Sequence, residues 1–431
     1  MSGGRGGRLA RAVGSWWAAL RIARREARRA RGRTALVLAM ITLPVLVLTF
    51  TAVNWDMAEL TPAERIERQL GAADAELLRV AAQPIVQSPW GDNWNSRQGE
   101  PAPAAAVTAE EVTALLPAGS RVTPLRRWVS FDARVGERVE GNLTGRVVDL
   151  ADPLGRGLVR FHQGRPPAGP DEIAVSPAAA RRLDVRTGGT VTSGDGVRSW
   201  RVVGVAEYPD DLGPVVTLHP AATRRGEADP DNNSWLVDLP GAVDEGLFRR
   251  LNERGVLVHA RVPGPPPESD DIAALPPERR YSLDAEGMSV SVLVGGLGLL
   301  EVVLLVGPAF AVGVRRRRRD LALVAVAGGD DAQLRRIVLA DGVVLGAVGA
   351  ATGVALGIAA AFAGRSLMEQ YFFGARFGGY RCWPAALAAI AAVAVLAGVL
   401  AALAPAWTAA RQDVVAGLAG RRTPPAHRRR W

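Results

Sequence analysis

The sequence predicts an α-helical membrane protein with four transmembrane helices and a large α+β extracytoplasmic domain between the first and the second helix. Two observations predict this fold class: the spacing of four long apolar runs and the distribution of arginine around them. Each run has about 20 residues or more, enough at about 1.5 Å per residue to cross a hydrocarbon core of about 30 Å. The four predicted spans are residues 34–54, 289–314, 337–364 and 385–407.

Arginine clusters predict the orientation of these spans. The formal net charge is +9, but residues 55–288 contain more acidic side chains than arginines, so the basic excess lies elsewhere. It precedes the first span, follows the second directly and follows the fourth. Positively charged loops stay on the cytoplasmic side. We therefore expect both termini to be cytoplasmic. The predicted cytoplasmic segments are residues 1–33, 315–336 and 408–431, and the predicted external segments are residues 55–288 and 365–384.

The first apolar run has the basic front of a secretory signal peptide. It is longer than the apolar core of about 7 to 15 residues in such peptides, and no clear cleavage site follows it before Asn54. We therefore interpret it as a retained anchor. The basic run ahead of it, which begins near Trp16 and Trp17, predicts a helix in the cytoplasmic membrane interface.

Residues 55–288 carry signals for a mixed domain that folds without a disulfide, because Cys382 is the only cysteine. Thr108 and Glu111 form a capping box, and Ser176 caps another short helix. A third helix is predicted at residues 243–253, and strands are predicted at residues 128–135, 138–150, 171–175, 190–192, 199–207, 236–239 and 256–260. The proline-rich residues 263–277 predict a stiff connector to the second span.

The sequence offers no catalytic constellation. Its four histidines have no metal-ligand spacing, and no Gly-x-Ser-x-Gly turn is present. The chain has no lysine, so it cannot carry the phosphate-binding loop whose lysine reaches the β and γ phosphates. We predict that the chain is not an enzyme and holds no cofactor or metal, so that any ATP binds a partner subunit. Nucleic acid is not an expected partner, because the basic clusters adjoin apolar spans and the large domain is acidic.

The cytoplasmic stretch between the second and third spans contains a candidate site. Residues 320–327 predict a short helix that Asp320 caps and that ends at the glycine pair beginning with Gly328. A helix lying parallel to the membrane there would expose Leu321 and Leu323. Its periodicity fits a surface that couples to a partner protein as well as it fits a helix that rests on lipid.

The same stretch resembles the cytoplasmic signature of the FtsX/MacB-like ABC transporter permease family. The shared pattern is an arginine pair, an acidic residue, a Leu-rich helix, a glycine, a glutamine, a basic pair and an embedded carboxylate. The matching residues are Arg318, Arg319, Asp320, Leu321, Leu323, Gly328, Gln333, Arg335, Arg336 and Asp341. Residues 33–36, 164–176, 202–205 and 405–418 are similar to other parts of the family. Two positions depart from it: Ala325 replaces a usual basic residue, and Val414 replaces a usual proline.

The resemblance implies a permease subunit of an ABC-type complex in the bacterial plasma membrane. Such subunits pair as dimers and bind cytosolic ABC ATPase chains, and ATP hydrolysis moves their external domains in export or mechanotransmission. The residues implied in ATPase coupling are Asp320, Leu321, Leu323, Gly328 and Gln333. A membrane-anchored regulator whose external domain controls a cell-wall hydrolase is the alternative. A secondary transporter fits poorly, because four spans and one embedded acid offer few coupling sites.

The spans contain glycines and two acidic residues as further candidates. Small residues at four-residue spacing let helices approach closely, and they predict packing against another span or a second copy of the chain. The glycines concerned are Gly342, Gly346, Gly349, Gly353 and Gly357. Glu301 lies near the middle of the second span, where a lipid-facing carboxylate costs several kcal/mol, so we expect a buried packing contact in preference to a proton relay. Asp341 lies near the cytoplasmic end of the third span and is the weaker functional candidate.

Overall fold

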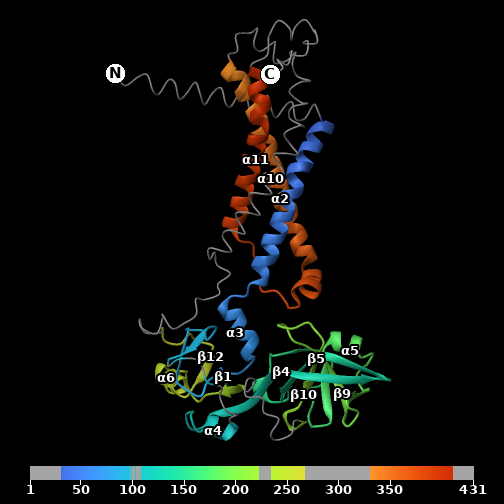
Figure 1. Cartoon of the computed structure of the whole chain (residues 1–431), viewed down its shortest axis with the longest axis vertical. Coiled ribbons are helices and arrows are strands. Elements are labelled where there is room, and N and C mark those ends of the chain that lie inside the picture. Colours follow the sequence, from blue (N-terminus) through green and yellow to red (C-terminus); the bar gives the residue numbers. More distant parts are fainter. Residues whose placement is uncertain are drawn as a thin grey trace, which may run out of the picture. The chain divides into compact units, whose positions relative to one another are not determined.

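The computed structural model describes residues 31–97, 99, 102, 108–222, 234–266 and 331–410. The chain forms two compact units. One holds the long helices α2 (Arg31–Ala58), α10 (Asp331–Met368) and α11 (Pro384–Ala410). The other, here called the sheet domain, holds the β-sheet and its short helices, and it includes the segment Ser366–Gly379, here called the elbow (Figure 1). The second predicted span lies outside the described residues.

Three of the described helices are long and apolar enough to cross a membrane: Thr34–Ala58, Val338–Phe373 and Pro384–Leu403. They coincide with the first, third and fourth predicted spans. Their buried core consists almost entirely of aliphatic side chains from all three helices, including Ile41, Val45, Leu345 and Ala397. The π-helical turn η4 (Glu369–Phe373) follows α10 directly and ends at Gly374, which has a left-handed backbone.

The sheet domain is built on a mixed ten-stranded sheet, with the strand order β12-β1-β11-β4-β5-β10-β7-β9-β6 and with β8 paired to β4 and β9. Most pairs are antiparallel, and β5 with β10 and β7 with β9 are parallel. The strands are β1 (Ala75–Arg79), β4 (Arg121–Val135), β5 (Arg138–Val148), β6 (Arg160–Gly164), β7 (Glu172–Val175), β8 (Thr190–Ser193), β9 (Ser199–Glu207), β10 (Val215–Leu218), β11 (Ser234–Asp238) and β12 (Val256–Ala260). Strands β2 (Ile85–Gln87) and β3 (Trp94–Ser96) form a separate hairpin.

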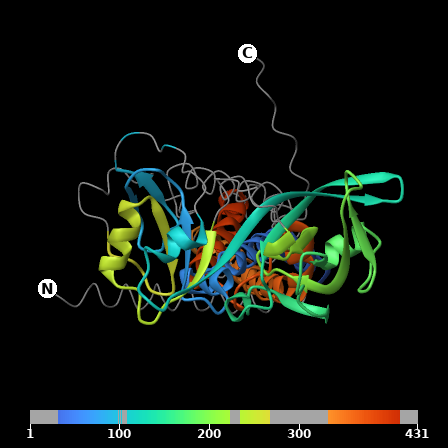
Figure 2. The ribbon, with the colours of Figure 1, turned by 90° about the horizontal axis from the view of Figure 1, so that it is seen from below.

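Short helices cover the two ends of this sheet, and the long strands β4 and β5 run between those ends (Figure 2). At one end, α6 (Glu245–Glu253) and α4 (Ala109–Thr113) bury Phe248, Leu251 and Val112 against β1, β11 and β12. At the other end, α5 (Pro177–Arg182) buries Ala179 in a core with Phe131 and Trp200. The remaining short elements are α3 (Pro62–Leu70), η1 (Pro153–Gly155) and η2 (Pro220–Ala222).

The predicted caps are confirmed at both helices. Thr108 and Glu111 form a reciprocal capping box at α4, and the Ser176 hydroxyl accepts from the Ala179 amide at the start of α5. A second capping box, made by Thr61 and Glu64, begins α3 only three residues after α2 ends. Each cap satisfies backbone N–H groups that have no partner inside the helix.

A buried ion pair links β4 to β1 across the intervening strand β11. Arg127 donates from Nε and Nη2 to the two carboxylate oxygens of Glu76, at 3.1 and 2.8 Å. Burial opposes ionisation of Glu76, but the charge and hydrogen bonds of Arg127 outweigh it and lower the pKa of Glu76. Arg127 also donates to the Gln69 carbonyl oxygen, so the end of α3 is held on the same pair.

Candidate functional site

The predicted coupling site lies mostly outside the described residues. Asp320, Leu321, Leu323 and Gly328 all precede Asp331, where the description resumes, and the same is true of Glu301 in the second span. Gln333 lies in the first turn of α10. The candidate residues that the structure places are therefore those of the membrane helices.

The five glycines of α10 lie where the helix touches its two neighbours. A methyl group at Gly342 would come within 2.6 Å of the Gly398 carbonyl oxygen on α11, and one at Gly346 within 3.1 Å of the Val395 Cα. On the α2 side, a methyl group at Gly349, Gly353 or Gly357 would come within 2.8, 2.7 or 2.6 Å of Ile41, Val45 or Thr49. Since ordinary carbon contacts are about 3.5 to 4.0 Å, a side chain at Gly342, Gly349, Gly353 or Gly357 would force the neighbouring helix to shift, and one at Gly346 would make a tight contact. The contacts are made within one chain.

Asp341 is buried on α10, next to Gly342 and the contact with α11. A carboxylate in this environment is costly unless it is paired or neutral. Its expected position near the cytoplasmic end of the third span stays a prediction.

The elbow is held by an arginine that bridges two carboxylates. Arg376 donates from Nε and Nη2 to the two oxygens of Glu207 at the end of β9, both at 2.9 Å, and from Nη1 to Glu369 of η4 at 2.8 Å. Glu207 and Glu369 are buried, with residue exposures of 8% and 3%. Such a fork-like pair fixes orientation as well as charge. Hydrogen bonds from Arg376 lower the pKa of Glu207, and burial opposes this shift less strongly.

Backbone contacts extend the same attachment. The Arg376 amide donates to the Pro209 carbonyl oxygen at 2.7 Å, and the Leu212 amide donates to the Gly374 carbonyl oxygen at 2.7 Å. Phe377 is buried and stacks edge-on against Phe373. The elbow therefore docks along the connection between β9 and β10 by main-chain pairing and by an apolar anchor, not only by charge.

Helix α3 also binds the elbow, and the contacts that Arg376, Arg68 and Glu64 make there are here called the clamp. Arg68 donates to the carbonyl oxygens of Arg376 and Phe377. Glu64 accepts from the Gly379 amide at 3.0 Å while its other oxygen caps α3. Helix α3 follows α2 after three residues, and the elbow lies in the connection from α10 to α11. The hydrogen bonds between α3 and the elbow therefore join two segments of the sheet domain that are continuous in sequence with membrane helices.

A second arginine secures the loop on which the elbow rests. Arg146 is 1% exposed, donates to both oxygens of Asp210 at 3.3 and 3.1 Å, and lies over the Tyr208 ring at 4.1 Å. This loop is thus fixed to β5 on one side and to the elbow on the other. Neither arginine was a sequence candidate. The sequence does carry one signal for Arg376: it lies seven residues after Glu369 in a short loop between two predicted spans.

The clamp is a mechanical attachment and offers no catalytic chemistry. Among the described residues, no three His, Cys, Asp or Glu side chains gather to hold a metal ion. Cys382 is a half-buried free thiol just ahead of α11.

Comparison with known proteins gives one family match. Residues 292–414 match the family described as FtsX-like permease C-terminal. No curated protein matches the chain in sequence.

Two solved structures are similar to part of this chain. The periplasmic region of MacB from Actinobacillus actinomycetemcomitans is 14% identical, with a TM-score of 0.32 over 46% of this chain and 94% of that one. A domain of a protein described as a permease, from Porphyromonas gingivalis, is 11% identical, with a TM-score of 0.27 over 50% of this chain and 93% of that one. Both TM-scores are too low for these likenesses to carry a functional argument.

Proposed function

We propose that this chain, whose C-terminal region is that of an FtsX-like permease, is the membrane subunit of an ABC-type transporter complex in a bacterial plasma membrane. The single observation that carries the proposal is the family match over residues 292–414. The predicted coupling residues from Asp320 to Gln333 all lie inside the matched region. The chain is then not itself an enzyme, and its partner is a cytosolic ABC ATPase.

The absence of lysine supports this division of labour. A chain without lysine lacks the side chain that a phosphate-binding loop places on the β and γ phosphates of ATP. The nucleotide would therefore bind the ATPase, and the permease would receive its motion through the helix at residues 320–327. Leu321 and Leu323 would fill an apolar cleft on the ATPase.

The clamp supports a mechanical role for the sheet domain. A rotation or shift of α2, α10 or α11 would pass along the chain into α3 and the elbow, which Arg376, Arg68 and Glu64 hold together. Rigid hydrogen-bonded elements of this kind transmit displacement without a wide pore. We propose that two permease copies, or this chain and a related one, move their sheet domains together when the ATPase subunits close.

Affinity purification of the full chain from its native host tests the proposal. Tagged wild-type protein should co-purify with an ABC ATPase, and the complex should hydrolyse ATP. The Leu321→Asp variant should not co-purify with that ATPase. Truncating an interface anchor costs about 2 kcal/mol or more, and an unpaired buried carboxylate adds to that loss. Leu9→Asp makes the same change in the basic N-terminal segment, on the same predicted side of the membrane, and should leave the complex intact.

Two results would contradict different parts of the proposal: the first the coupling helix, the second the transporter function itself. Recovery of the same ATPase at full yield with Leu321→Asp and Leu323→Asp combined would show that the helix at residues 320–327 rests on lipid. Recovery of a cell-wall hydrolase by wild-type protein, without any ATPase, would favour the regulator alternative.

A further inference from the structure

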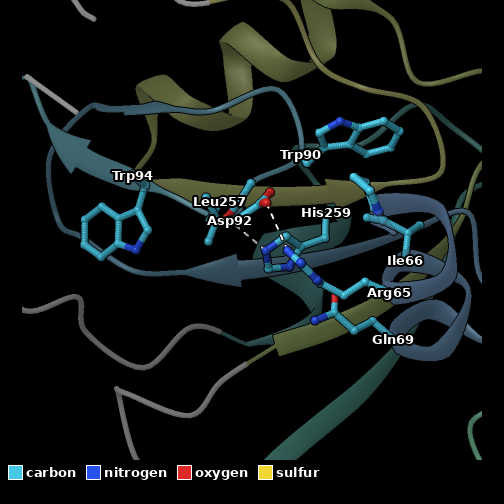
Figure 3. Close-up of a pocket in the computed structure, with 10 residues that line it drawn as sticks. Arg65, Ile66, Gln69, Trp90, Asp92, Trp94, Leu257 and His259 are labelled. Carbon is cyan, nitrogen blue, oxygen red and sulfur yellow. Dashed lines mark hydrogen bonds and ion pairs between the residues drawn. The ribbon is translucent and has the colours of Figure 1, made fainter. Parts of the chain in front are cut away.

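A pocket of about 330 Å³ opens in the sheet domain between α3, the turn that joins β2 to β3, and β12 (Figure 3). One face of α3 lines it at helical spacing. The turn contributes Trp90 and Asp92, β3 contributes Trp94, and β12 contributes residues from one side of the strand. The residues that line the pocket include Arg65, Ile66, Gln69, Trp90, Asp92, Trp94, Leu257 and His259. The volume is at the small end of the range of about 300 to 1,000 Å³ for small-molecule sites.

The walls of the pocket are fixed in place without a ligand. The Gln87 side chain accepts from the Val258 amide and donates to the Val258 carbonyl oxygen, both at 2.9 Å, so the hairpin is bound to the edge strand β12. Gly91 has a φ of +75°, and a Cβ there would lie 2.6 Å from the His259 ring. His259 Nε2 lies 3.1 Å from the Gly91 carbonyl oxygen. The site is therefore preorganised, which lowers the cost of binding.

The lining combines an apolar body with few polar groups. Ile66 and Leu257 are buried, and Trp94 packs beside Leu257. The Gln69 side-chain amide makes no hydrogen bond with the described residues, although the Gln69 carbonyl oxygen is engaged by Arg127. Apolar walls with a few polar groups, here the Gln69 amide and the charged pair of Arg65 and Asp92, are typical of a site for a small ligand that has both an apolar and a polar part.

The charged pair determines the class of ligand. Arg65 Nη1 lies 3.0 Å from Asp92 Oδ2, and the two side chains are 43% and 46% exposed. A ligand with one charge would satisfy one of them and leave the other without its partner. A ligand with both an ammonium and a carboxylate can separate the pair and replace each interaction with an equivalent one.

We propose that this pocket binds a free α-amino acid with a large apolar side chain. Its carboxylate pairs with Arg65, its ammonium pairs with Asp92, and its side chain lies against Ile66 and Leu257. The inference goes beyond the transporter function and does not depend on an ATPase. The opposite side of α3 holds the elbow through Glu64 and Arg68, so a ligand that fixes α3 acts on the segment that joins α10 to α11.

Equilibrium dialysis of the purified full chain in lipid nanodiscs, with tritiated L-phenylalanine as the probe, tests the proposal. We expect saturable binding that unlabelled L-phenylalanine and L-leucine displace. Phenylalanine amide lacks the carboxylate and 3-phenyllactate lacks the ammonium, so each should compete at least about 10-fold more weakly, the usual loss for one charged hydrogen-bonded contact. L-alanine keeps both charges but lacks the large apolar side chain, whose burial stabilises the complex, so it should also compete about 10-fold more weakly or worse. N-acetylglucosamine, which could use only the tryptophans and the amide, should not compete.

Substitutions identify the site. Arg65→Gln and Asp92→Asn should each weaken L-phenylalanine binding by about 10-fold or more, for the same reason. Arg249→Gln breaks an ion pair with Glu245 whose side chains are 64% and 58% exposed on α6, and it should leave binding unchanged. Because both tested side chains are half exposed, the melting temperature of each variant should match that of wild type.

The competition series uses the unaltered chain and therefore decides the proposal even if a variant is unstable. No saturable binding at millimolar L-phenylalanine would overturn it. Equal competition by the amide, by phenyllactate or by N-acetylglucosamine would overturn the zwitterion assignment. Unchanged affinity in both Arg65→Gln and Asp92→Asn would place any observed binding elsewhere.

Discussion

Arg376 and Glu207, which are 169 residues apart in the sequence, form a two-point ion pair with both N–O distances at 2.9 Å. The pair joins the loop between two membrane helices to the end of β9. Its arginine also neutralises Glu369, so one side chain compensates two buried carboxylates. Removing it would leave both acids buried without their main partner, which is more costly than the loss of an exposed pair.

Arg376→Ala should therefore lower the free energy of unfolding of the sheet domain by about 3 kcal/mol, as expected when one partner of a buried pair is removed. Hydrogen exchange should accelerate at the amides of Arg376, Phe377 and Gly379, which the attachment protects. Arg376→Lys should lower the free energy of unfolding by less than Arg376→Ala does, because an ammonium keeps the positive charge but cannot bind both carboxylate oxygens in the same planar geometry. Arg182→Ala is the matched control. The Arg182 side chain is 38% exposed against 35% for Arg376, but its partner Glu140 is 31% exposed. Unchanged exchange in Arg376→Ala would show that main-chain contacts alone hold the elbow.

The pH dependence of the clamp follows from Glu207. Hydrogen bonds from Arg376 lower the pKa of this carboxyl below its usual value of 4.5. A carboxylate with a lowered pKa in the folded state contributes stability that is complete above the usual pKa and is lost as the pH falls through the lowered value. The melting temperature of Glu207→Gln should therefore lie below that of wild type at pH 7, and the difference should shrink as the pH falls from 4.5. Glu245→Gln, on the exposed face of α6, should show no such convergence. A wild-type to Glu207→Gln difference that is constant from pH 7 to pH 3 would contradict the assignment.

Local signals in the sequence predict many elements of the fold, because short-range patterns determine them. The run 199–207 is rich in valine and other residues typical of strands, and it is observed as β9 with the same bounds. The cap at Ser176 depends only on the next three residues. Helix α3 was missed, although Thr61, Pro62 and Glu64 carry its start signal, because it lies next to a long apolar span. The elbow and the pocket could not be predicted, since their residues come from segments that only the folded sheet brings together.

The predicted topology is open to test at Cys382, which is half buried in the described structure. The charge distribution predicts that this thiol lies outside the cell and that residues 315–336 lie inside. A membrane-impermeant maleimide should label Cys382 in intact cells. A Cys382→Ser, Gly329→Cys variant should be labelled only after the membrane is permeabilised. Labelling of the Gly329→Cys thiol in intact cells would reverse the orientation of the third span or show that it does not cross the membrane.

The close contact between α2 and α10 at Gly353 gives the sharpest prediction for the membrane unit. A Cβ at Gly353 would lie 2.7 Å from Val45 Cβ and 2.9 Å from the Thr42 carbonyl oxygen, so Gly353→Ala must push the two backbones apart. Overpacking of this kind costs about 1 to 3 kcal/mol. Gly364→Ala is the matched control on the same helix, because its Cβ would meet nothing closer than Phe50 at 3.8 Å. Unfolding of the purified chain in mixed micelles, followed by tryptophan fluorescence, measures both.

A second substitution separates steric overlap from helix flexibility. Val45→Ala removes the γ methyl groups that approach Gly353 but keeps Val45 Cβ and the Thr42 carbonyl oxygen, so it should restore only part of the stability lost in Gly353→Ala. Alanine also favours a helix interior more than glycine does, by about 1 kcal/mol. If propensity dominated, Gly353→Ala and Gly364→Ala would both stabilise the chain. A stabilised Gly353→Ala variant would mean that α2 and α10 do not pack at this glycine.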